Sequence, residues 1–270
     1  MTLVVCATPI GNLDDVTLRV LQALRDADVV LCEDTRHTRL LLARYGISAR
    51  LLSYHEHNEA ERTAELLPRL REGELVALVS DAGLPAISDP GARLIAAALE
   101  SGVPVSVLPG ASAVETALVA SGLAAERYQF VGYLPRGERA LAALWSELAR
   151  WPHAVVAFES PRRLPATLVS LGRALPDRHA AVCRELTKRF EEVVRGTPAE
   201  LAERFREPPR GEITLVLGPA GPVPAADEDA ELAAAAVAEL VAGGLPRRAA
   251  ADVVARLTGI PRNRLYDRSL

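Results

Sequence analysis

The stretch "LVALVSDAGLPAISDPGARL", residues 75–94, decides the fold class. It begins with the apolar run Leu75–Val79, which is typical of a strand. A loop with two aspartates, two glycines and two prolines follows this run. We expect the next helix to start near Pro90, with Asp89 as its N-cap, and to end at Gly102. A strand, a polar loop and a helix in this order predict one repeat of an α/β fold.

The same pattern extends through the first half of the chain. We expect strands at residues 3–7, 29–32 and 51–52 and a further strand within "VPVSVLPGASA". We expect helices at residues 16–25 and 59–71, and a helix between them that follows the loop "EDTR" and ends at residue 44. This alternation predicts parallel strands, and parallel sheets bind ligands beyond the carboxyl ends of their strands. The loops "TPIGN", "EDTR", "SDAGLP" and "LPGAS" all leave such ends. Each loop alone is consistent with a tight turn, but several at one edge predict a pocket where backbone approaches a ligand.

A second α/β unit is expected to follow. Its strands are predicted at residues 129–133, 154–158, 180–184, 192–195 and 213–217, and its helices at 138–150, 161–174 and 198–206. The segment "GPAGPVPAADED" from Gly218 is typical of a linker, and an alanine-rich helix is expected at about 231–242. The predicted domains are an N-terminal α/β domain at 1–113, a second α/β domain at 114–221, and a linker with a helical tail at 222–270.

The tail changes sign of charge. Residues 227–244 sum to −5, whereas residues 245–270 contain six arginines and two aspartates and sum to +4. Ala255, Gly259, Ile260 and Leu265 have the spacing of a helix-turn-helix corner. Two readings stay open from these residues: a basic helical hairpin that touches a phosphate backbone, and a helical cap on the second domain.

Composition excludes several classes of protein. The chain has 49% hydrophobic and 24% charged residues and a net charge of −4, so it has no overall basic field to attract nucleic acid. It contains no apolar run of membrane-spanning length, and its start has no basic region typical of a signal peptide. Cys6, Cys32 and Cys183 lie singly in apolar runs, which favours reduced thiols in the cytoplasm. His55 and His57 have no Cys/His partner cluster, so we expect no metal site.

The common catalytic motifs are missing. The chain has no P-loop, no G-x-G-x-x-G after its first strand, no G-x-S-x-G elbow and no H-E-x-x-H zinc motif. Lys188 is the only lysine in an arginine-rich chain. Lysine is a compact charge with a tunable pKa, so its retention here hints at a chemical role, although an ordinary surface lysine is the simpler reading. These patterns predict a two-domain α/β protein with a glycine-bearing cleft and do not name its ligand.

Nine segments taken together resemble one known family. They are "TPIGNLDDVTLRVLQAL", "CEDTRHTRLLL", "SYHEHNE", "LVSDAGLPAISDPGARL", "VLPGASAVETALVASGL", "FVGYLPR", "FESPRRL", "CRELTKRFEEVVRGT" and "RGEITLVLGP". In this order they resemble the ribosomal RNA small subunit methyltransferase I family, which belongs to the tetrapyrrole-methylase superfamily. The resemblance covers essentially the whole chain, including the tail. Ser80 and Ala82 depart from the Gly-Asp-Pro donor loop frequent in that superfamily, so Asp81 is the residue of this loop that carries over.

The resemblance implies a function. It implies S-adenosyl-L-methionine as the methyl donor, with transfer to the ribose 2′-oxygen of a cytidine in the decoding region of 16S rRNA. It also implies two α/β domains with the donor in the cleft between them, a homodimer, and the small ribosomal subunit as partner. No membrane contact and no metal are expected.

Site residues follow from the loops and the resemblance. We expect the donor to contact Pro9, Gly11, Asn12, Ser80, Asp81, Ala82, Gly83, Pro109, Gly110, Ser112, Tyr133, Leu134 and Phe158, and RNA to contact Arg136, Arg162, Arg247, Arg248, Arg262 and Arg264. A ribose hydroxyl is a poor nucleophile, so a base or a cation beside it would help. Lys188, Asp34 and Glu185 are the preferred catalytic candidates, and Glu33 and His55 are further ones. Structural ion pairs with Arg36 and Arg184 are the alternative roles for the acidic candidates.

Two rival functions are weighed, and the second belongs to another class. The first is a small-molecule methyltransferase of the same fold, against which the basic tail and the arginines near "YLPRGER" and "ESPRRL" argue. The second is a non-catalytic RNA-binding assembly factor. The complete set of cleft loops argues against it, because a protein that only binds RNA does not need a donor site.

Overall fold

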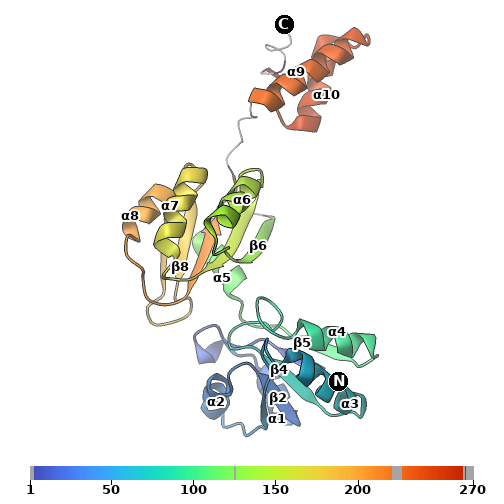
Figure 1. The fold of residues 1–270 in the computed structure, drawn as a ribbon, viewed down its shortest axis with the longest axis vertical. Coiled ribbons are helices and arrows are strands. Elements are labelled where there is room, and N and C mark those ends of the chain that lie inside the picture. Colours follow the sequence, from blue (N-terminus) through green and yellow to red (C-terminus); the bar gives the residue numbers. More distant parts are fainter. Residues whose placement is uncertain (1–2, 125, 221–226, 264, 266–270) are drawn as a thin grey trace. The chain divides into compact units, whose positions relative to one another are not determined.

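The computed structural model describes residues 3–124, 126–220, 227–263 and 265. The chain divides into two compact units, residues 1–219 and 220–270 (Figure 1). The larger unit contains two five-stranded sheets, and the smaller one is helical. Within the described residues, no helix is long and apolar enough to cross a membrane.

The first sheet is entirely parallel, as predicted, with strand order β3-β2-β4-β1-β5. Its strands are β1 (Leu3–Cys6), β2 (Val29–Cys32), β3 (Leu51–Ser53), β4 (Val76–Val79) and β5 (Val105–Leu108), and its helices are α1 (Leu18–Asp26), α2 (Thr35–Arg44), α3 (Glu59–Arg71) and α4 (Ala92–Glu100), with a 3-10 turn at Leu13–Asp15. Every residue of β1, β2 and β4 is buried, because helices cover both faces of the sheet.

The start of α4 corrects one prediction. The helix begins at Ala92 with Gly91 as its N-cap, not near Pro90 with Asp89 as the cap. Gly91 has φ +136, a conformation that suits glycine. The Oε1 atom of Glu59 in α3 accepts hydrogen bonds from the N–H groups of Gly91 (3.1 Å) and Arg93 (3.3 Å). A carboxylate from a neighbouring helix therefore satisfies the N–H groups that a local cap would otherwise bind.

The second sheet is mixed, with strand order β6-β7-β10-β8-β9. Its strands are β6 (Tyr128–Tyr133), β7 (Ala154–Glu159), β8 (Ala180–Arg184), β9 (Glu192–Gly196) and β10 (Ile213–Leu217), and its helices are α5 (Ala113–Ser121), α6 (Glu138–Ala149), α7 (Leu164–Ala174) and α8 (Pro198–Arg204). Only the β6–β7 pair is parallel. No helix separates β8 from β9, so these strands pair as a hairpin whose loop, residues 185–191, leaves the carboxyl end of β8.

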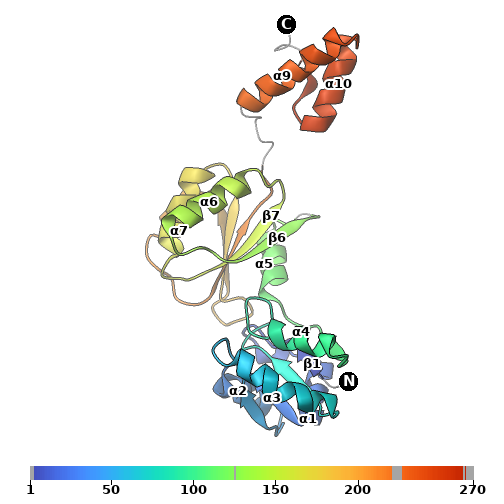
Figure 2. The ribbon, with the colours of Figure 1, turned by 45° about the vertical axis from the view of Figure 1, so that its right-hand side comes forward.

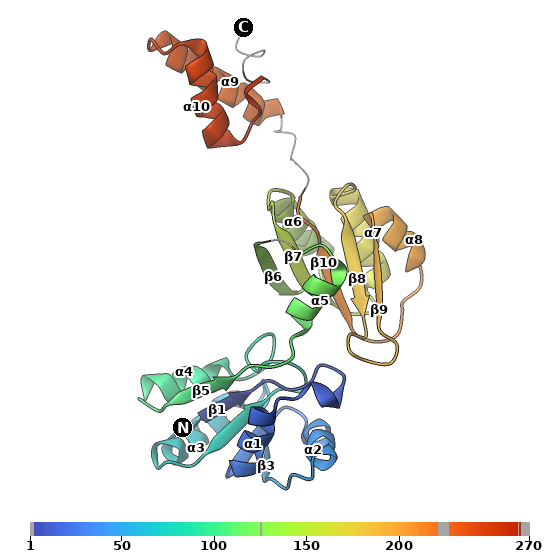
Figure 3. The same cartoon turned by 180° about the vertical axis from the view of Figure 1, so that it is seen from behind.

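Helices cover the two faces of this sheet differently. Figure 2 shows α6 and α7 over one face, where Trp145 and Leu168 join the main core. Figure 3 shows α5 against the opposite face. Ile10, from the loop after β1, packs into the same cluster as Leu118 of α5 and Leu186 of the hairpin loop. An apolar contact thus ties the first sheet's loop to the second sheet.

The small unit is a pair of helices, α9 (Asp227–Ala242) and α10 (Arg247–Thr258). Val237 and Val254 pack in its own core together with Ile260 and Leu265. Gly259 ends α10 with φ +73, the left-handed conformation expected of a helix-ending glycine. The corner predicted from the sequence is therefore present, with a glycine in the turn and apolar anchors after it.

Candidate functional site

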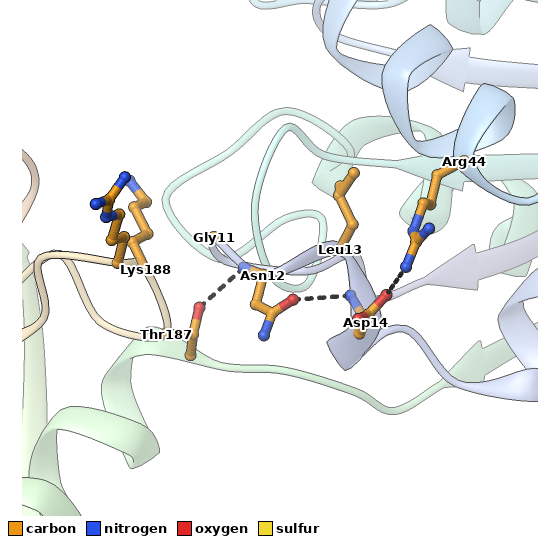
Figure 4. Close-up of a pocket in the computed structure, with 8 residues that line it drawn as sticks. Gly11, Asn12, Leu13, Asp14, Arg44, Thr187 and Lys188 are labelled. Atoms are coloured by element: carbon orange, nitrogen blue, oxygen red, sulfur yellow. Dashed lines mark hydrogen bonds and ion pairs between the residues drawn. The ribbon is translucent and has the colours of Figure 1, made fainter.

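A pocket of about 710 Å³ lies between the loop after β1 and the hairpin loop (Figure 4). It is lined by Gly11, Asn12, Leu13, Asp14, Arg44, Thr187, Lys188 and Arg189. Gly11, Asn12 and Lys188 were predicted as site residues from the sequence. The lining residues lie far apart in the chain, so the pocket exists only where the two α/β halves of the larger unit meet.

A hydrogen bond joins the two loops that line the pocket at Asn12. The N–H group of Asn12 donates a hydrogen bond to the Thr187 hydroxyl over 3.0 Å (Figure 4). A Cβ atom added at Gly11 would lie 2.5 Å from Cγ of Lys188. Glycine is therefore required here, because the lysine stem passes directly against the backbone of the loop after β1.

The hairpin loop carries backbone strain. Glu185 and Thr187 have φ values of +53 and +66, a backbone conformation that residues other than glycine rarely adopt. Carboxylates hold this conformation: Glu185 accepts the N–H of Glu212 at 3.0 Å, and Glu191 accepts the N–H of Thr187 at 2.6 Å. Strain that is held by surrounding contacts is frequent at functional sites.

The Lys188 ammonium is held between two carboxylates. Its Nζ atom lies 3.0 Å from Oε1 of Glu185 and 2.8 Å from Oε2 of Glu212. Partial burial lowers the pKa of Lys188, but the hydrogen bonds to Glu212 and Glu185 outweigh this effect, so its pKa is raised. The hydrogen bond from the Glu212 N–H, with help from Lys188, lowers the pKa of Glu185 despite some burial. At neutral pH both groups are therefore charged, and Lys188 acts as a fixed positive charge.

The loops after β1 and β4 are joined into one structure. Thr8 and Gly83 exchange backbone hydrogen bonds of 2.8 and 3.0 Å, and the Thr8 hydroxyl donates to the carbonyl of Ser80 at 3.0 Å. Gly83 has φ +80, so a glycine is needed for this bridge. The buried hydroxyl of Ser80 donates to the Gly83 carbonyl at 3.1 Å, which engages it inside the loop.

Carboxylates gather at this edge of the first sheet. Asp81 accepts the N–H of Asp34 at 3.1 Å, and its other oxygen lies 3.7 Å from Nδ1 of His37. Burial, followed by the charges of Glu33 and Asp81, raises the pKa of Asp89 to about 6. Burial and then the Asp81 charge also raise the pKa of Glu33. Several carboxylates close together at this edge make it favourable for a cationic ligand.

Comparison with known proteins places the chain in a family. The tetrapyrrole (corrin/porphyrin) methylases match residues 2–202, and the RsmI C-terminal HTH domain matches residues 226–270. The ribosomal RNA small subunit methyltransferase I of Micromonospora olivasterospora is 48% identical over 268 residues, covering 98% of this chain and 85% of that protein. The chain belongs to the ribosomal RNA small subunit methyltransferase I family. The resemblance seen in the nine segments is thereby confirmed.

Two further relatives define the extent of the match. The family member from Thermotoga maritima is 44% identical over 216 residues, which is 80% of this chain and 97% of that protein. The solved structure of uroporphyrin-III C-methyltransferase from Thermus thermophilus with S-adenosyl homocysteine is 21% identical, covers 81% of this chain and 97% of that chain, and has a TM-score of 0.56. This likeness shows the shared tetrapyrrole-methylase fold.

The structure gives Asp34 a structural role within this family fold. Asp34 is the N-cap of α2, where it accepts the N–H of Arg36 at 2.8 Å. Its carboxylate also lies 2.6 Å from Nη2 of Arg36. These hydrogen bonds from Arg36 hold the pKa of Asp34 well below its usual range, which makes it a weak base. The ion pair considered as its alternative role is present.

Aromatic and arginine residues of the second sheet hold the loop after β6. Leu134 is buried, its N–H donates to the Phe158 carbonyl at 3.0 Å, and its carbonyl accepts from Arg163 at 3.0 Å. Glu159 is only 2% exposed and lies 3.3 Å from Arg163. Tyr133 is 66% exposed, so it is the residue of this group that is free to meet a ligand. Sequence reasoning missed the Glu159–Arg163 pair, which joins the end of β7 to the residue that precedes α7.

The other predicted donor and RNA residues differ in their contacts and in their exposure to solvent. Gly110 runs close to β1, since an added Cβ would lie 2.9 Å from Cβ of Ala7, and the Ser112 hydroxyl bonds Glu115. Pro9 is buried, and Ala82 and Pro109 are exposed. Arg136, Arg162 and Arg248 are exposed, Arg247 is partly exposed, and Arg264 lies outside the described residues. Arg262 lies 3.4 Å from Asp252, which partly neutralises it.

The His55 ring makes one side-chain hydrogen bond among the described residues. Its Nδ1 atom is buried without a hydrogen-bond partner, and its Nε2 atom lies 3.3 Å from the amide nitrogen of Asn58. Among the described residues, no three His, Cys, Asp or Glu side chains are grouped to hold a metal ion. Five pocket residues were not predicted from the sequence: Leu13, Asp14, Arg44, Thr187 and Arg189.

The raised pKa of Asp89 predicts a pH-dependent stability. A pKa of about 6 in the folded state, against 3.8 ordinarily, means that folding favours the neutral carboxyl. The stability this gives is present below pH 3.8 and is lost as the pH rises through about 6. We expect Asp89→Asn to unfold at higher urea concentration than the wild type above pH 6, with the difference shrinking towards pH 4. Urea titrations across this range check it, with the exposed Asp15→Asn as control. A variant less stable than wild type above pH 6 would contradict the prediction.

Proposed function

We propose that this protein transfers a methyl group from S-adenosyl-L-methionine to the ribose 2′-oxygen of a cytidine in the decoding region of 16S rRNA. The observation that carries the proposal is the nearly full-length identity of 48% to a ribosomal RNA small subunit methyltransferase I. A pocket with a charged lysine at the meeting of the two halves supports it.

The loops of the first sheet fit the donor. When bound, S-adenosyl-L-methionine supplies an electrophilic methyl group on a sulfonium cation. The carboxylates around Asp81 and Asp89 give the negative potential that such a cation needs. Gly83 and Gly110 keep side chains away from the backbone of the joined loops. We assign Pro9, Gly11, Asn12, Ser80, Asp81, Ala82, Gly83, Pro109, Gly110, Ser112 and the second-sheet residues Tyr133, Leu134 and Phe158 to this donor region.

Lys188 is suited to the acceptor. Methyl transfer would form the bond between the methyl carbon and the ribose oxygen and break the carbon–sulfur bond, leaving S-adenosyl homocysteine, with the hydroxyl proton passing to water. An ammonium beside that oxygen stabilises the negative charge that develops as the proton leaves. Glu185 and Glu212 keep Lys188 charged and fix its direction, so they position the cation. The lowered pKa of Glu185 and Asp34 makes either carboxylate a poor acceptor for that proton.

The helical tail is assigned to RNA. Its arginines, Arg247, Arg248, Arg262 and Arg264, join Arg136 and Arg162 of the second sheet in the proposed contact with phosphates of the small ribosomal subunit. The Thermotoga maritima family member is matched over 97% of its length by 80% of this chain. The tail is therefore proposed to add RNA affinity to a complete catalytic unit. We also propose a cytoplasmic homodimer.

Methyl transfer to assembled subunits tests the proposal. Purified protein is incubated with isotopically labelled S-adenosyl-L-methionine and 30S subunits, and the label is mapped by nuclease digestion and mass spectrometry. We expect one labelled cytidine with the methyl group on its ribose. Binding to subunits without transfer would favour the assembly factor, and labelling of an added porphyrin-type ring in place of RNA would favour the small-molecule methyltransferase.

Glycine substitutions test the donor region. Gly83→Val places a β-branched residue at φ +80, and Gly110→Val brings a Cβ to within 2.9 Å of Ala7. We expect both variants to lose donor affinity by about tenfold or more, a change of about 1.4 kcal/mol. Calorimetric titration with S-adenosyl homocysteine measures this, and circular dichroism verifies folding. Unchanged donor affinity in both folded variants would show that the donor binds elsewhere.

Lysine substitutions test the role of Lys188. We expect Lys188→Ala and Lys188→Arg both to lower the rate of methyl transfer by about 100-fold, because arginine is larger and cannot occupy the same space against Gly11. Donor and RNA affinities should stay near wild type. Single-turnover methylation at saturating RNA measures the rate. If Lys188→Arg keeps full activity and Lys188→Ala loses only RNA affinity, then Lys188 contacts phosphate and does not take part in catalysis.

A further inference from the structure

The pocket at the hairpin loop is lined by two arginines in addition to the catalytic candidate Lys188. Arg44, Lys188 and Arg189 line it, against the single carboxylate of Asp14. Arg44 pairs with Asp14 at 3.0 Å, and Lys188 pairs with two carboxylates. Arg189 has no carboxylate partner among the described residues and is exposed. One guanidinium in the pocket is thus uncompensated in a chain whose net charge is −4.

An exposed aromatic ring adjoins this guanidinium. Phe190 is 64% exposed, and the Cζ atom of Arg189 lies 5.5 Å from its ring centroid. A single exposed apolar side chain is ordinary on a protein surface. Here, however, the ring stands beside the positive pocket, on the strained loop that also carries Lys188. Proteins that bind single-stranded RNA combine such cations for the backbone with aromatic faces on which bases stack.

Charge distinguishes the hairpin side of the pocket from the carboxylate-rich loops of the donor region. The loops after β2 and β4 carry Glu33, Asp81 and Asp89, which favour a cation. The hairpin loop presents the Arg189 guanidinium, which has no carboxylate partner among the described residues and favours an anion. A donor with a sulfonium suits the first group of residues, and a phosphodiester suits the second.

We propose that Arg189 and Phe190 form a subsite for a nucleotide that flanks the methylated cytidine. Arg189 binds a phosphodiester of the acceptor strand, and Phe190 stacks on the neighbouring base. Arg44 lines the same pocket and pairs with Asp14, and we assign it a second contact with a phosphate of the RNA acceptor strand. This assignment rests on the proposed function and names the part of the enzyme that presents the ribose to Lys188.

The test uses the full chain and a fluorescein-labelled single-stranded RNA copied from the 16S decoding region. Arg189→Gln should weaken binding and reduce the slope of log affinity against log salt by about 0.7, because one phosphate contact is lost. Phe190→Leu should weaken binding about tenfold without changing the slope, and Phe190→Tyr should keep wild-type affinity because it keeps the aromatic face.

A matched control guards against a general loss of charge. Arg173 is exposed in the last turn of α7, at the amino end of β8 and so at the opposite end of that strand from the hairpin loop. Arg173→Gln should leave both the affinity and the salt slope unchanged. Calorimetry with S-adenosyl homocysteine should give the same donor affinity for all four variants.

Several outcomes would overturn the subsite. The subsite is wrong if the Arg189→Gln and Phe190→Leu variants bind RNA like the wild type. It is also wrong if Arg173→Gln weakens RNA binding as much as Arg189→Gln does. Loss of donor affinity with intact RNA binding would show that the pocket holds the anionic end of the donor. Failure of the proposed function is distinguishable, because it appears as a wild type that transfers no methyl group while its RNA binding still depends on Arg189 and Phe190.

Discussion

The close approach of two loops is the constraint on which the site depends. The N–H of Asn12 binds the Thr187 hydroxyl, and the absent side chain of Gly11 leaves room for the Lys188 stem. Ile10 adds an apolar anchor in the core of the second sheet. Without these contacts the glycine loops of one sheet and the cation of the other would have no fixed relation, and in-line transfer depends on fixed positions.

The strained hairpin loop is held by its own carboxylates. Glu185 serves two purposes with one oxygen, because Oε1 accepts both the Glu212 N–H and the Lys188 ammonium. The same residue therefore stabilises an unusual backbone conformation and fixes a charge. An added Cβ at Gly211 would collide with the Glu185 side chain, so this glycine makes room for the carboxylate. The ion pair that the sequence suggested with Arg184 is replaced by this arrangement, and Arg184 pairs with Glu192 instead.

Local patterns predicted the first sheet, because each of its parallel strands is a short apolar run followed by a polar loop and a helix. The tail corner was predictable for the same reason, since Gly259 and Ile260 are neighbours in sequence. The cap of α4 was not, because Glu59 reaches it from another helix. The pocket lining was predicted only in part. Arg44 and Thr187 line the same pocket because of tertiary packing, and the local sequence pattern contains no information on that packing. The sole lysine, and Glu185 at the end of a predicted strand, were the local signals that pointed to the hairpin loop.

The distribution of charge follows from the chemistry proposed for the site. A sulfonium donor needs a negative environment, whereas an RNA acceptor brings its own negative charge and is repelled by carboxylates. Placing both sets of residues on one sheet edge would cost binding to one of the two substrates. The fold separates them: Asp81 and Asp89 follow a strand of the parallel sheet, and Lys188 and Arg189 lie on a hairpin of the mixed sheet. The antiparallel pairing of β8 and β9 is what allows a short, strained loop to carry these cations to the edge of the other half, because a parallel crossover would have required a helix in its place.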